Sequence, residues 1–282
     1  MKMYKMTYSG HETFHCRLFW LKKGYDYLTV NDNFSEESGV DLGVGKNMIN
    51  SIRYWMKAFG ALDEDNNLSA LFQQLLNDEG WDPYLEHQGT NWLLHYMICK
   101  TNNASIYREI FSELRKLKPE FSKEHFVSFA KGNNSRLRDN ILGKDFSVFI
   151  RTYMDKGSDG DGFTSGLLAD LNLVHELGKN YSGEIVYRIE NRFPDDLPNK
   201  ILLFSILDNP EYSNSIDFNS LYSSVNGPGN IFALNERDLE SKLEELADNY
   251  PSIVYKNEAG VKELQFKQPI DKWEILDEFY AE

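Results

Sequence analysis

The sequence has few of the residues that mark secreted or membrane-spanning chains. It contains two cysteines, Cys16 and Cys99, in 282 residues, too few for the disulfide framework of a small secreted protein. Its apolar stretches, such as residues 201–207, are far shorter than the ~20 residues that span a bilayer. Residues 1–16 also lack the apolar core of a signal peptide. These absences predict a cytoplasmic protein that makes no membrane contact.

Positive charge is also scarce, because 30 Lys and Arg face 44 Asp and Glu, for a net charge of −14. A DNA-binding protein neutralises phosphates with Lys and Arg, so this total speaks against nucleic acid. Counted by segment, however, the net charge is +2 over residues 1–60, −7 over 61–99, +5 over 100–156 and −14 over 157–282. We therefore expect any DNA contact to be made by residues 1–156. An acidic surface that merely maintains solubility is the alternative interpretation.

The residues that are present indicate a packed, mainly α-helical chain with small β-hairpins, an α+β fold. A length of 282 residues suggests about two domains, and 14% aromatic residues argue against disorder. One pattern of short helices, a longer helix and a hairpin occurs three times, which is typical of winged-helix modules. We predict tandem winged-helix-like modules linked by helical segments, with boundaries at residues 1–100, 101–192 and 193–282.

Apolar spacing and turn residues place the elements of each module. In the first module they predict helices over 14–28 and 46–59 and a small wing over 62–68. In the second they predict helices over 106–117, 122–129 and 137–154 and a strand over 181–189. In the third they predict helices over 200–207, 218–223 and 236–249, a hairpin over 252–267 and a final helix over 273–280.

The sharpest motif is His11-Glu12-Thr13-Phe14-His15, which matches the H-E-x-x-H pattern of zinc peptidases. That pattern needs a long helix, which puts two imidazoles on one face with the glutamate as general base. Here Ser9 and Gly10 precede the motif directly, and a helix start upstream is missing. A zinc metallopeptidase is therefore one hypothesis, and a capping or polar anchoring role for this segment is the other.

Polar and basic residues lie on the predicted helix 46–59, away from its apolar face. A recognition helix needs such side chains to reach base edges and phosphates. The candidate DNA contacts of this module are Lys46, Asn47, Asn50, Arg53 and Lys57, grouped with Ser51, while Lys22 and Lys23 could hold the DNA backbone. In the second module Arg136 and Arg138, with Ser135, Lys144 and Arg151, make the long helix basic. An ordinary solvated helix face is the alternative for both sets.

Asp82 and Glu86 form a second candidate acid/base or metal cluster, with His87 next in sequence and His95 further on. They would share a helix face if a helix continued past Pro83. A metal-dependent nuclease needs carboxylates of this kind near the scissile phosphate. The alternative is that these are helix-start acids in front of a buried aromatic segment, residues 92–99.

Landmarks along nearly the whole chain resemble one bacterial family. The strongest are Ser9-Gly10-His11-Glu12-Thr13-Phe14, Arg17, and the run from Leu42 to Met48 that enters the long helix. Further landmarks are Asp82-Pro83-Tyr84-Leu85-Glu86, residues 92–95, Glu258-Ala259-Gly260 and residues 276–280. The sequence resembles the defence-island family, encoded beside sulfur-transfer proteins, that includes the SspB-like DNA nickase of Ssp DNA phosphorothioation systems.

This resemblance implies an anti-phage defence protein that binds double-stranded DNA and nicks it to allow sulfur incorporation. It also implies sulfur-transfer and ATPase proteins as partners. Within the matching segment we expect His11 and Glu12 to act as acid/base or metal-handling residues near Arg17, with Mg²⁺ or Mn²⁺ as cofactor and with ligands unknown. Asp82 and Glu86 are the second choice. His15 lies outside the family pattern, which weakens the zinc hypothesis. The alternative function is a non-catalytic DNA-binding adaptor that docks those partners.

Overall fold

The computed structural model describes residues 6–35, 37–155, 165–190, 196–258 and 260–282. The chain divides into two compact units, Met1–Ile189 and Glu190–Glu282. The predicted boundary at residue 100 falls inside helix α5 of the first unit, and the boundary at residue 192 lies near the division between the units. Within the described residues, no helix is long and apolar enough to span a bilayer.

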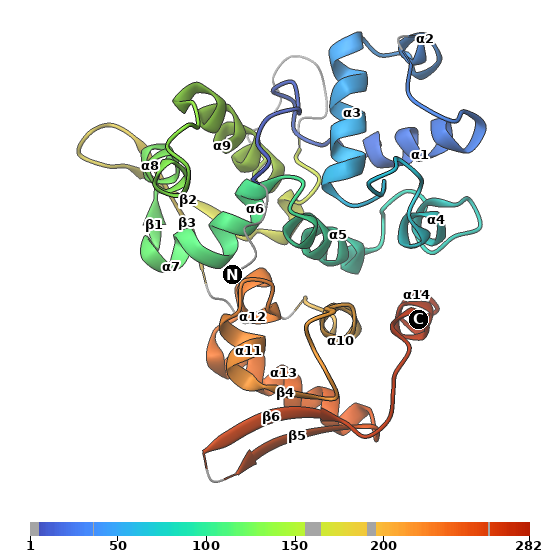
Figure 1. The fold of residues 1–282 in the computed structure, drawn as a ribbon, viewed down its shortest axis with the longest axis vertical. Helices are drawn as coiled ribbons and strands as arrows, with labels where there is room; N and C mark the ends of the chain where they lie inside the picture. The colour runs from blue at the N-terminus through green and yellow to red at the C-terminus, as the bar shows by residue number, and fades with distance from the viewer. Residues whose placement is uncertain (1–5, 36, 156–164, 191–195, 259) are drawn as a thin grey trace. The chain divides into compact units, whose positions relative to one another are not determined.

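The first unit begins with a set of helices (Figure 1), and aromatic side chains such as Trp55, Phe72 and Trp92 are buried in it. The helices are α1 (Trp20–Val30), α2 (Ser38–Leu42), α3 (Lys46–Ala58), α4 (Ala70–Leu76) and α5 (Gln88–Thr101). Helix α3 buries Ile49, Ile52, Trp55 and Met56 on one face, as its apolar spacing predicts. In α5 every residue of the run from Gly89 to Cys99 is buried, which confirms the expectation for residues 92–99.

The remainder of the first unit combines helices with a three-stranded antiparallel sheet. Helix α6 (Ser105–Glu109) continues through a π-helical turn, η1 (Ile110–Leu114), and α7 (Arg115–Leu117). Strand β1 (Glu120–Phe121), helices α8 (Lys123–Asn133) and α9 (Asp139–Tyr153), a 3₁₀ turn η2 (Ala169–Leu171) and strands β2 (Val174–Lys179) and β3 (Ile185–Ile189) follow. The sheet order is β1-β3-β2, so the first strand pairs with the last.

The second unit has an order of elements similar to that from α6 to β3 of the first unit: a helix, a strand, further helices and a hairpin, with one more helix at its end. Helix α10 (Asn199–Leu207) leads into β4 (Ser215–Asp217), α11 (Phe218–Ser223), α12 (Pro228–Ile231), α13 (Glu236–Asn249), β5 (Ile253–Glu258), β6 (Val261–Phe266) and α14 (Lys272–Tyr280). Its sheet has the order β4-β6-β5, again with the first strand beside the last. The mainly helical α+β class predicted from the sequence is confirmed.

The predicted start of the first helix, residues 14–28, is wrong. The apolar spacing predicts a helix from residue 14, whereas α1 begins at Trp20. Residues 14–19 form no helix, because hydrogen bonds to residues far along the chain hold this segment in an irregular conformation. The amide of Leu167, for example, donates to the carbonyl oxygen of Cys16 at 3.3 Å.

Candidate functional site

The segment Ser9–Phe14 is a loop with unusual backbone conformations rather than a helix. Ser9, Gly10, Glu12 and Thr13 all have positive φ angles, a region that side chains other than glycine seldom occupy. At Gly10 a Cβ atom would lie 2.8 Å from Cδ2 of Tyr54, so only glycine fits there. Such a conformation persists only when surrounding contacts hold it.

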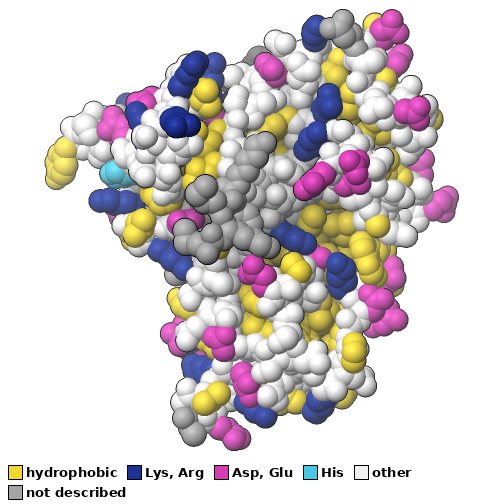
Figure 2. Space-filling view, in the orientation of Figure 1, with side chains coloured by type: hydrophobic (Ala, Val, Ile, Leu, Met, Phe, Trp, Pro, Cys, Tyr) yellow, Lys and Arg dark blue, Asp and Glu magenta, His cyan; other side chains and the backbone are white. Residues whose placement is uncertain are grey.

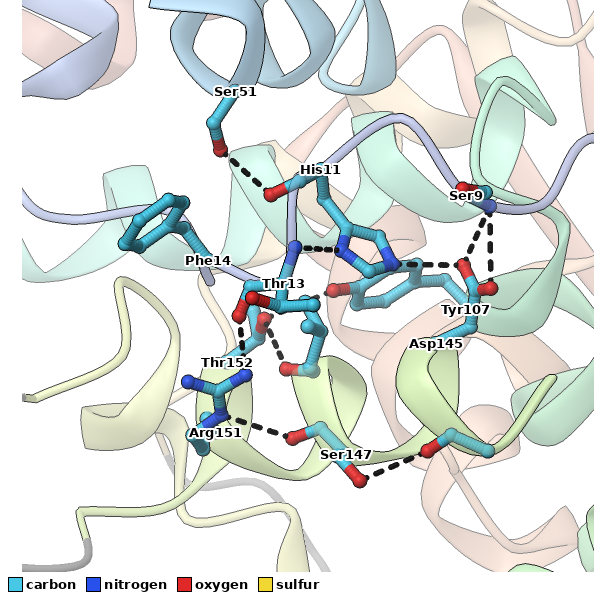
Figure 3. Close-up of polar contacts among 12 residues, drawn as sticks. Ser9, His11, Thr13, Phe14, Ser51, Tyr107, Asp145, Ser147, Arg151 and Thr152 are labelled. Carbon is cyan, nitrogen blue, oxygen red and sulfur yellow. Dashed lines mark hydrogen bonds and ion pairs between the residues drawn. The ribbon is translucent and has the colours of Figure 1, made fainter. Parts of the chain in front are cut away.

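The contacts that hold this loop centre on His11 and Asp145 of α9, both buried (Figure 3). The amide of Thr13 donates to His11 Nδ1 at 3.0 Å, so Nε2 carries the proton and faces Asp145 Oδ1 at 3.1 Å. The amide of Ser9 donates to both oxygens of the same carboxylate, at 2.9 and 3.2 Å. The buried carboxylate therefore receives hydrogen bonds from two residues of the loop, which compensates its loss of water.

Two other helices and a second residue of α9 bind the same loop. Ser51 of α3 donates its hydroxyl proton to the carbonyl oxygen of His11 at 3.0 Å, and the Trp55 indole donates to the carbonyl oxygen of Phe14 at 3.2 Å. Arg151 of α9 donates to the carbonyl oxygen of Thr13 (Figure 3). The loop thus joins α3 to α9, and the outward placement predicted for Ser51 is wrong because its side chain is buried in this contact.

The residues just before the loop are attached to α6. The amide of Thr7 donates to the Ser105 hydroxyl at 2.7 Å, and the Tyr8 hydroxyl lies within 2.8 Å of both carboxylate oxygens of Glu109. Burial raises the pKa of Glu109 to about 7. The hydrogen bond from Tyr8 lowers this pKa, and the negative charge of nearby Glu113 raises it further. Glu109 is consequently a titratable group inside the framework that carries the loop.

This geometry does not form a zinc-peptidase helix. Residues 11–15 are not helical, so His11 and His15 do not share a helix face. Both ring nitrogens of His11 already have hydrogen-bond partners within the protein. In the described residues no three His, Cys, Asp or Glu side chains are grouped as a metal site would require. His11 is an anchor, whereas the side chain of Glu12 points to solvent as an exposed residue.

Helices α8 and α9 present a hollowed basic surface beside this loop. A cavity of about 690 Å³ is lined by Thr13 and by residues of the two helices, namely Lys123, Glu124, Val127, Ser128, Asp139, Asn140, Gly143, Lys144, Ser147 and Arg151. A second cavity of about 450 Å³ on the side of β3 shares Lys123, Ser147 and Arg151. Figure 2 shows Lys and Arg side chains over this part of the surface. Arg136 and Arg138 are exposed in the turn that enters α9.

Three of the five predicted contacts on α3 meet in one small cavity. Lys46, Asn50 and Arg53 line about 280 Å³ together with Phe34, Ser35 and Ile49. Asn47 is exposed nearby, and Lys57 is half-buried further along the helix. The structure therefore brings the first half of α3 together as a polar, basic face.

The two lysines of α1 differ in their surroundings. Lys22 is buried, and its ammonium group lies 2.6 Å from carboxylate oxygens of both Asp26 and Asp78. Its charge is thus compensated within the protein, which makes it unsuitable for a DNA phosphate. Lys23 is exposed and remains a candidate.

Asp82 and Glu86 are not on a common helix face, because α5 begins only at Gln88. Asp82 is buried, and its carboxylate accepts hydrogen bonds from the amides of Glu86 and His87 and from the Thr90 hydroxyl, at 2.6–3.0 Å. It shapes the turn before α5, as the alternative interpretation of these acids expects. Glu86 is exposed.

Glu86 instead meets Arg17 and Lys23 in the cavity with the largest volume among those described, about 770 Å³. Asn91, Ser165 and Asp170 are the other polar residues of its wall, and the apolar part consists of Leu18, Phe19, Trp20, Val44, Met48, Leu85 and Leu167, with Gly166. The Arg17 guanidinium lies 5.5 Å from the centre of the Trp20 ring. We call this space the Arg17 cavity. It brings together Arg17 and Glu86, which the sequence analysis named as catalytic candidates, and Lys23, which it named as a DNA contact.

The sequence predictions did not include Asp145, Lys123, Asn91 or Asp170. Asp145 carried a usable signal, because it stands between Leu142, Phe146 and Phe149 on the inward face of α9. A charged residue at a core position must have a partner. The other three carry no comparable signal, since only the fold brings residues this distant in sequence together.

The fold and these surfaces define a mainly helical α+β protein with two repeated helix–sheet modules and a basic face. The chain belongs to the family described as "Protein of unknown function (DUF4007)", whose model matches residues 8–280. It is similar to the solved structure "Magnesium ion-bound SspB crystal structure", at 25% identity, with a TM-score of 0.85, over 98% of this chain and 88% of that chain. A second, "SspB crystal structure", matches at 24% identity with a TM-score of 0.83.

These matches establish an SspB-like protein, as the sequence resemblance predicts, and support its link to the Ssp phosphorothioation systems. A comparison with curated proteins gave no significant match.

Proposed function

We propose that this protein binds double-stranded DNA within a phosphorothioation-linked anti-phage defence system in the bacterial cytoplasm. The observation that carries the proposal is the hollowed face of α8 and α9, where the cations Lys123, Lys144 and Arg151 outnumber the carboxylates Glu124 and Asp139. Membership of the SspB-like family supports the assignment of this DNA binding to a phosphorothioation-linked defence system.

The order of the elements supports winged-helix modules. In both units a helix, a strand, further helices and a two-stranded hairpin follow one another, with the first strand at the edge of the sheet beside the last. A winged helix uses its last helix before the hairpin for recognition in the major groove. In the first unit that helix is α9, and the β2–β3 hairpin with its exposed Tyr181 corresponds to the wing.

The test is fluorescence anisotropy with a labelled 20-base-pair duplex at several salt concentrations. The double variant Lys123→Ala/Lys144→Ala should bind about tenfold more weakly and lower the slope of log K against log salt by about 2. The matched control is Lys131→Ala, because Lys131 lies on α8 but is already paired with Asp139 at 2.6 Å. An unchanged affinity in the double variant would contradict the proposed surface.

A second proposal is that the protein nicks DNA and that the Arg17 cavity is the site of this reaction. It is favoured by the meeting of Arg17 with the carboxylates of Glu86 and Asp170 in one cavity. A guanidinium can hold a phosphate through two hydrogen bonds. Oxygen ligands suit Mg²⁺, which needs only one or two carboxylates besides water and phosphate. Glu86 and Asp170 would hold the ion, and a bound Mg²⁺ or Mn²⁺ would stabilise charge on the phosphate. Such a site is consistent with the magnesium-bound SspB structure.

Relaxation of supercoiled plasmid with Mg²⁺ or Mn²⁺ tests this proposal. We expect nicking by the unaltered protein and at least 100-fold slower nicking by Glu86→Gln. Glu12→Gln serves as the comparison, because Glu12 is exposed in the anchored loop and is not part of the cavity wall. If Glu12→Gln abolished nicking and Glu86→Gln did not, the centre would lie at the loop, as the sequence first indicated.

The second unit suits the partner-docking role of the adaptor hypothesis better than DNA contact. Its helix α13 has the same place in the module as α9, but it carries six acidic and two basic residues. We propose that this unit docks the sulfur-transfer or ATPase proteins of the system. Pull-down with those proteins tests it, and binding of both DNA and partners without any nicking would favour the adaptor function.

A further inference from the structure

The Arg17 cavity has features that a flat DNA-backbone contact does not require. It is about 770 Å³ in volume, within the range of pockets that enclose small organic ligands. Aromatic and aliphatic side chains form one part of the wall, and ionisable or amide groups form the rest. A duplex lying on the surface would touch the rim of such a cavity but would not fill it.

The ionisable groups of the cavity have both signs. Lys23, Glu86 and Asp170 make no side-chain ion pair in the described part of the protein, and the described contact of the Arg17 guanidinium is with the Trp20 ring. Two cations and two carboxylates that line one space without pairing suggest a ligand that presents an anionic part and a hydrogen-bond donor part. A nucleotide has both, since its phosphate is an anion and most base edges carry N–H groups.

Asn91 gives a second, independent indication. It lies in the first turns of α5, is 9% exposed and lines the cavity. In the described structure its side-chain oxygen has no hydrogen-bond partner. A buried polar atom that lacks a partner is unfavourable, and the amino group of adenine or cytosine would supply the missing donor. Asparagine is also the side chain that pairs with adenine through two hydrogen bonds.

Phe19 supplies a surface for stacking. Its side chain is 52% exposed although it is aromatic, and it lines the same cavity as Asn91. A base that leaves the duplex loses its stacking partners, and an aromatic side chain can replace them. The apolar residues Leu18 and Met48 continue this part of the wall.

From this geometry we infer that the Arg17 cavity takes up a single nucleotide that has been extruded from the DNA helix. Phe19 stacks on the base, Asn91 accepts a hydrogen bond from its edge, and Arg17 and Lys23 hold the phosphate. This inference rests on the proposed DNA binding and names the substrate of the Arg17 cavity. Lys46, Asn50 and Arg53 lie on α3, the helix that also contributes Met48 to the cavity wall, and can hold the neighbouring backbone.

The test compares two labelled duplexes that differ only in one central base pair, which is either A·T or the mismatch A·C. Unpairing is less costly at a mismatch, so a protein that extrudes a base prefers it. The protein should bind the mismatched duplex about tenfold more tightly or better. Phe19→Ala and Asn91→Ala should each reduce that preference to less than about threefold. The control Tyr84→Ala, an aromatic residue that is 54% exposed and outside the cavity wall, should keep the preference.

The outcomes separate this inference from the proposed function. Equal affinity of the unaltered protein for both duplexes would overturn the inference and leave DNA binding intact. Absence of binding to either duplex would overturn both. A final experiment measures the binding of free dAMP to the protein in the absence of a duplex. Tight dAMP binding without any mismatch preference would show that the cavity takes a free nucleotide, which also overturns extrusion.

Discussion

At the scale of single residues, the match to H-E-x-x-H has a structural explanation. His11 is buried, accepts a hydrogen bond at Nδ1 and donates from Nε2 to Asp145. Its neighbours in the motif adopt positive φ angles that a catalytic helix does not allow. The imidazole therefore fixes a strained loop against α9.

Removal of the Asp145 carboxylate should destabilise the first unit strongly. Asp145→Ala leaves the Ser9 amide and His11 Nε2 without their acceptor in a buried place. We expect a loss of about 2–4 kcal/mol, or roughly 5–15 °C in Tm by calorimetry. Asp139→Ala, on the same helix but in an exposed ion pair, should leave Tm almost unchanged, because solvent screens such a pair. Equal losses in the two variants would argue against the anchoring role.

Glu109 should make stability depend on pH. Its pKa in the folded protein is about 7, above the ordinary value of 4.5, because the carboxyl is buried. The folded form therefore keeps a proton that the unfolded chain has released. This stabilisation is complete below about pH 4.5 and is lost as the pH rises through about 7. Thermal unfolding from pH 5.5 to 8 should show a steeper fall in Tm for the unaltered protein than for Glu109→Gln. Parallel curves would rule out this role.

At the scale of elements, the sequence predicted helices well where one face is continuously apolar. The spacing of Ile49, Ile52 and Met56 marks α3, and the predicted helix 236–249 agrees with α13, which Asn235 caps by accepting from the Asp238 amide. The start of α1 could not be predicted in the same way. Local spacing favours a helix there, but hydrogen bonds to residues more than 100 positions away prevent it. Only tertiary contacts carry that information.

The candidate site was predictable only in part, for the same reason. Arg17, Lys23 and Glu86 were each named from local sequence, and the fold places them around one cavity. Lys22 and Asp82 have the same residue types as good candidates, yet their charged groups are occupied inside the protein. Residue type therefore identifies candidate site residues, but the burial and pairing of each side chain in the fold decide whether it is available to a ligand.

Helix α3 offers a separate test at this scale. Lys46→Ala/Arg53→Ala removes two cations from one face of the helix, and each lost phosphate contact should weaken DNA binding by several-fold. Anisotropy with the paired duplex should show a further loss when this pair is combined with Lys123→Ala/Lys144→Ala. Lys256→Ala, an exposed lysine of the second unit, provides the control. If the α3 variant binds normally, α8 and α9 carry the contact alone.

At the scale of the whole molecule, the two units differ in charge although both contain a helix, a strand, further helices and a hairpin in that order. The first has 22 Lys and Arg against 25 Asp and Glu, and the second has 8 against 19. Their net charges are consequently −3 and −11. Two modules that differ this much in net charge are suited to two different ligands.

Charge reversal in the second unit should separate partner binding from DNA binding. Glu244 and Asp248 are exposed on α13, so Glu244→Lys/Asp248→Lys should weaken capture of a basic partner at least tenfold. Affinity for DNA should stay within about threefold or rise slightly, because repulsion decreases. Surface plasmon resonance with each ligand measures both. Loss of DNA binding in this variant would show that the second unit contacts DNA.

The anchored loop also constrains how the chain folds as it is made. Ser9 and Thr13 bind residues 136 and 138 positions further along the chain. At a synthesis rate of about 5–20 residues per second, those partners emerge roughly 7–30 s after the loop itself. Until then the segment has no acceptor in Asp145, and the gap between α3 and α9 stays open. Residues 9–13 are thus made well before the residues that bind them and reach their final positions only after α9 has emerged.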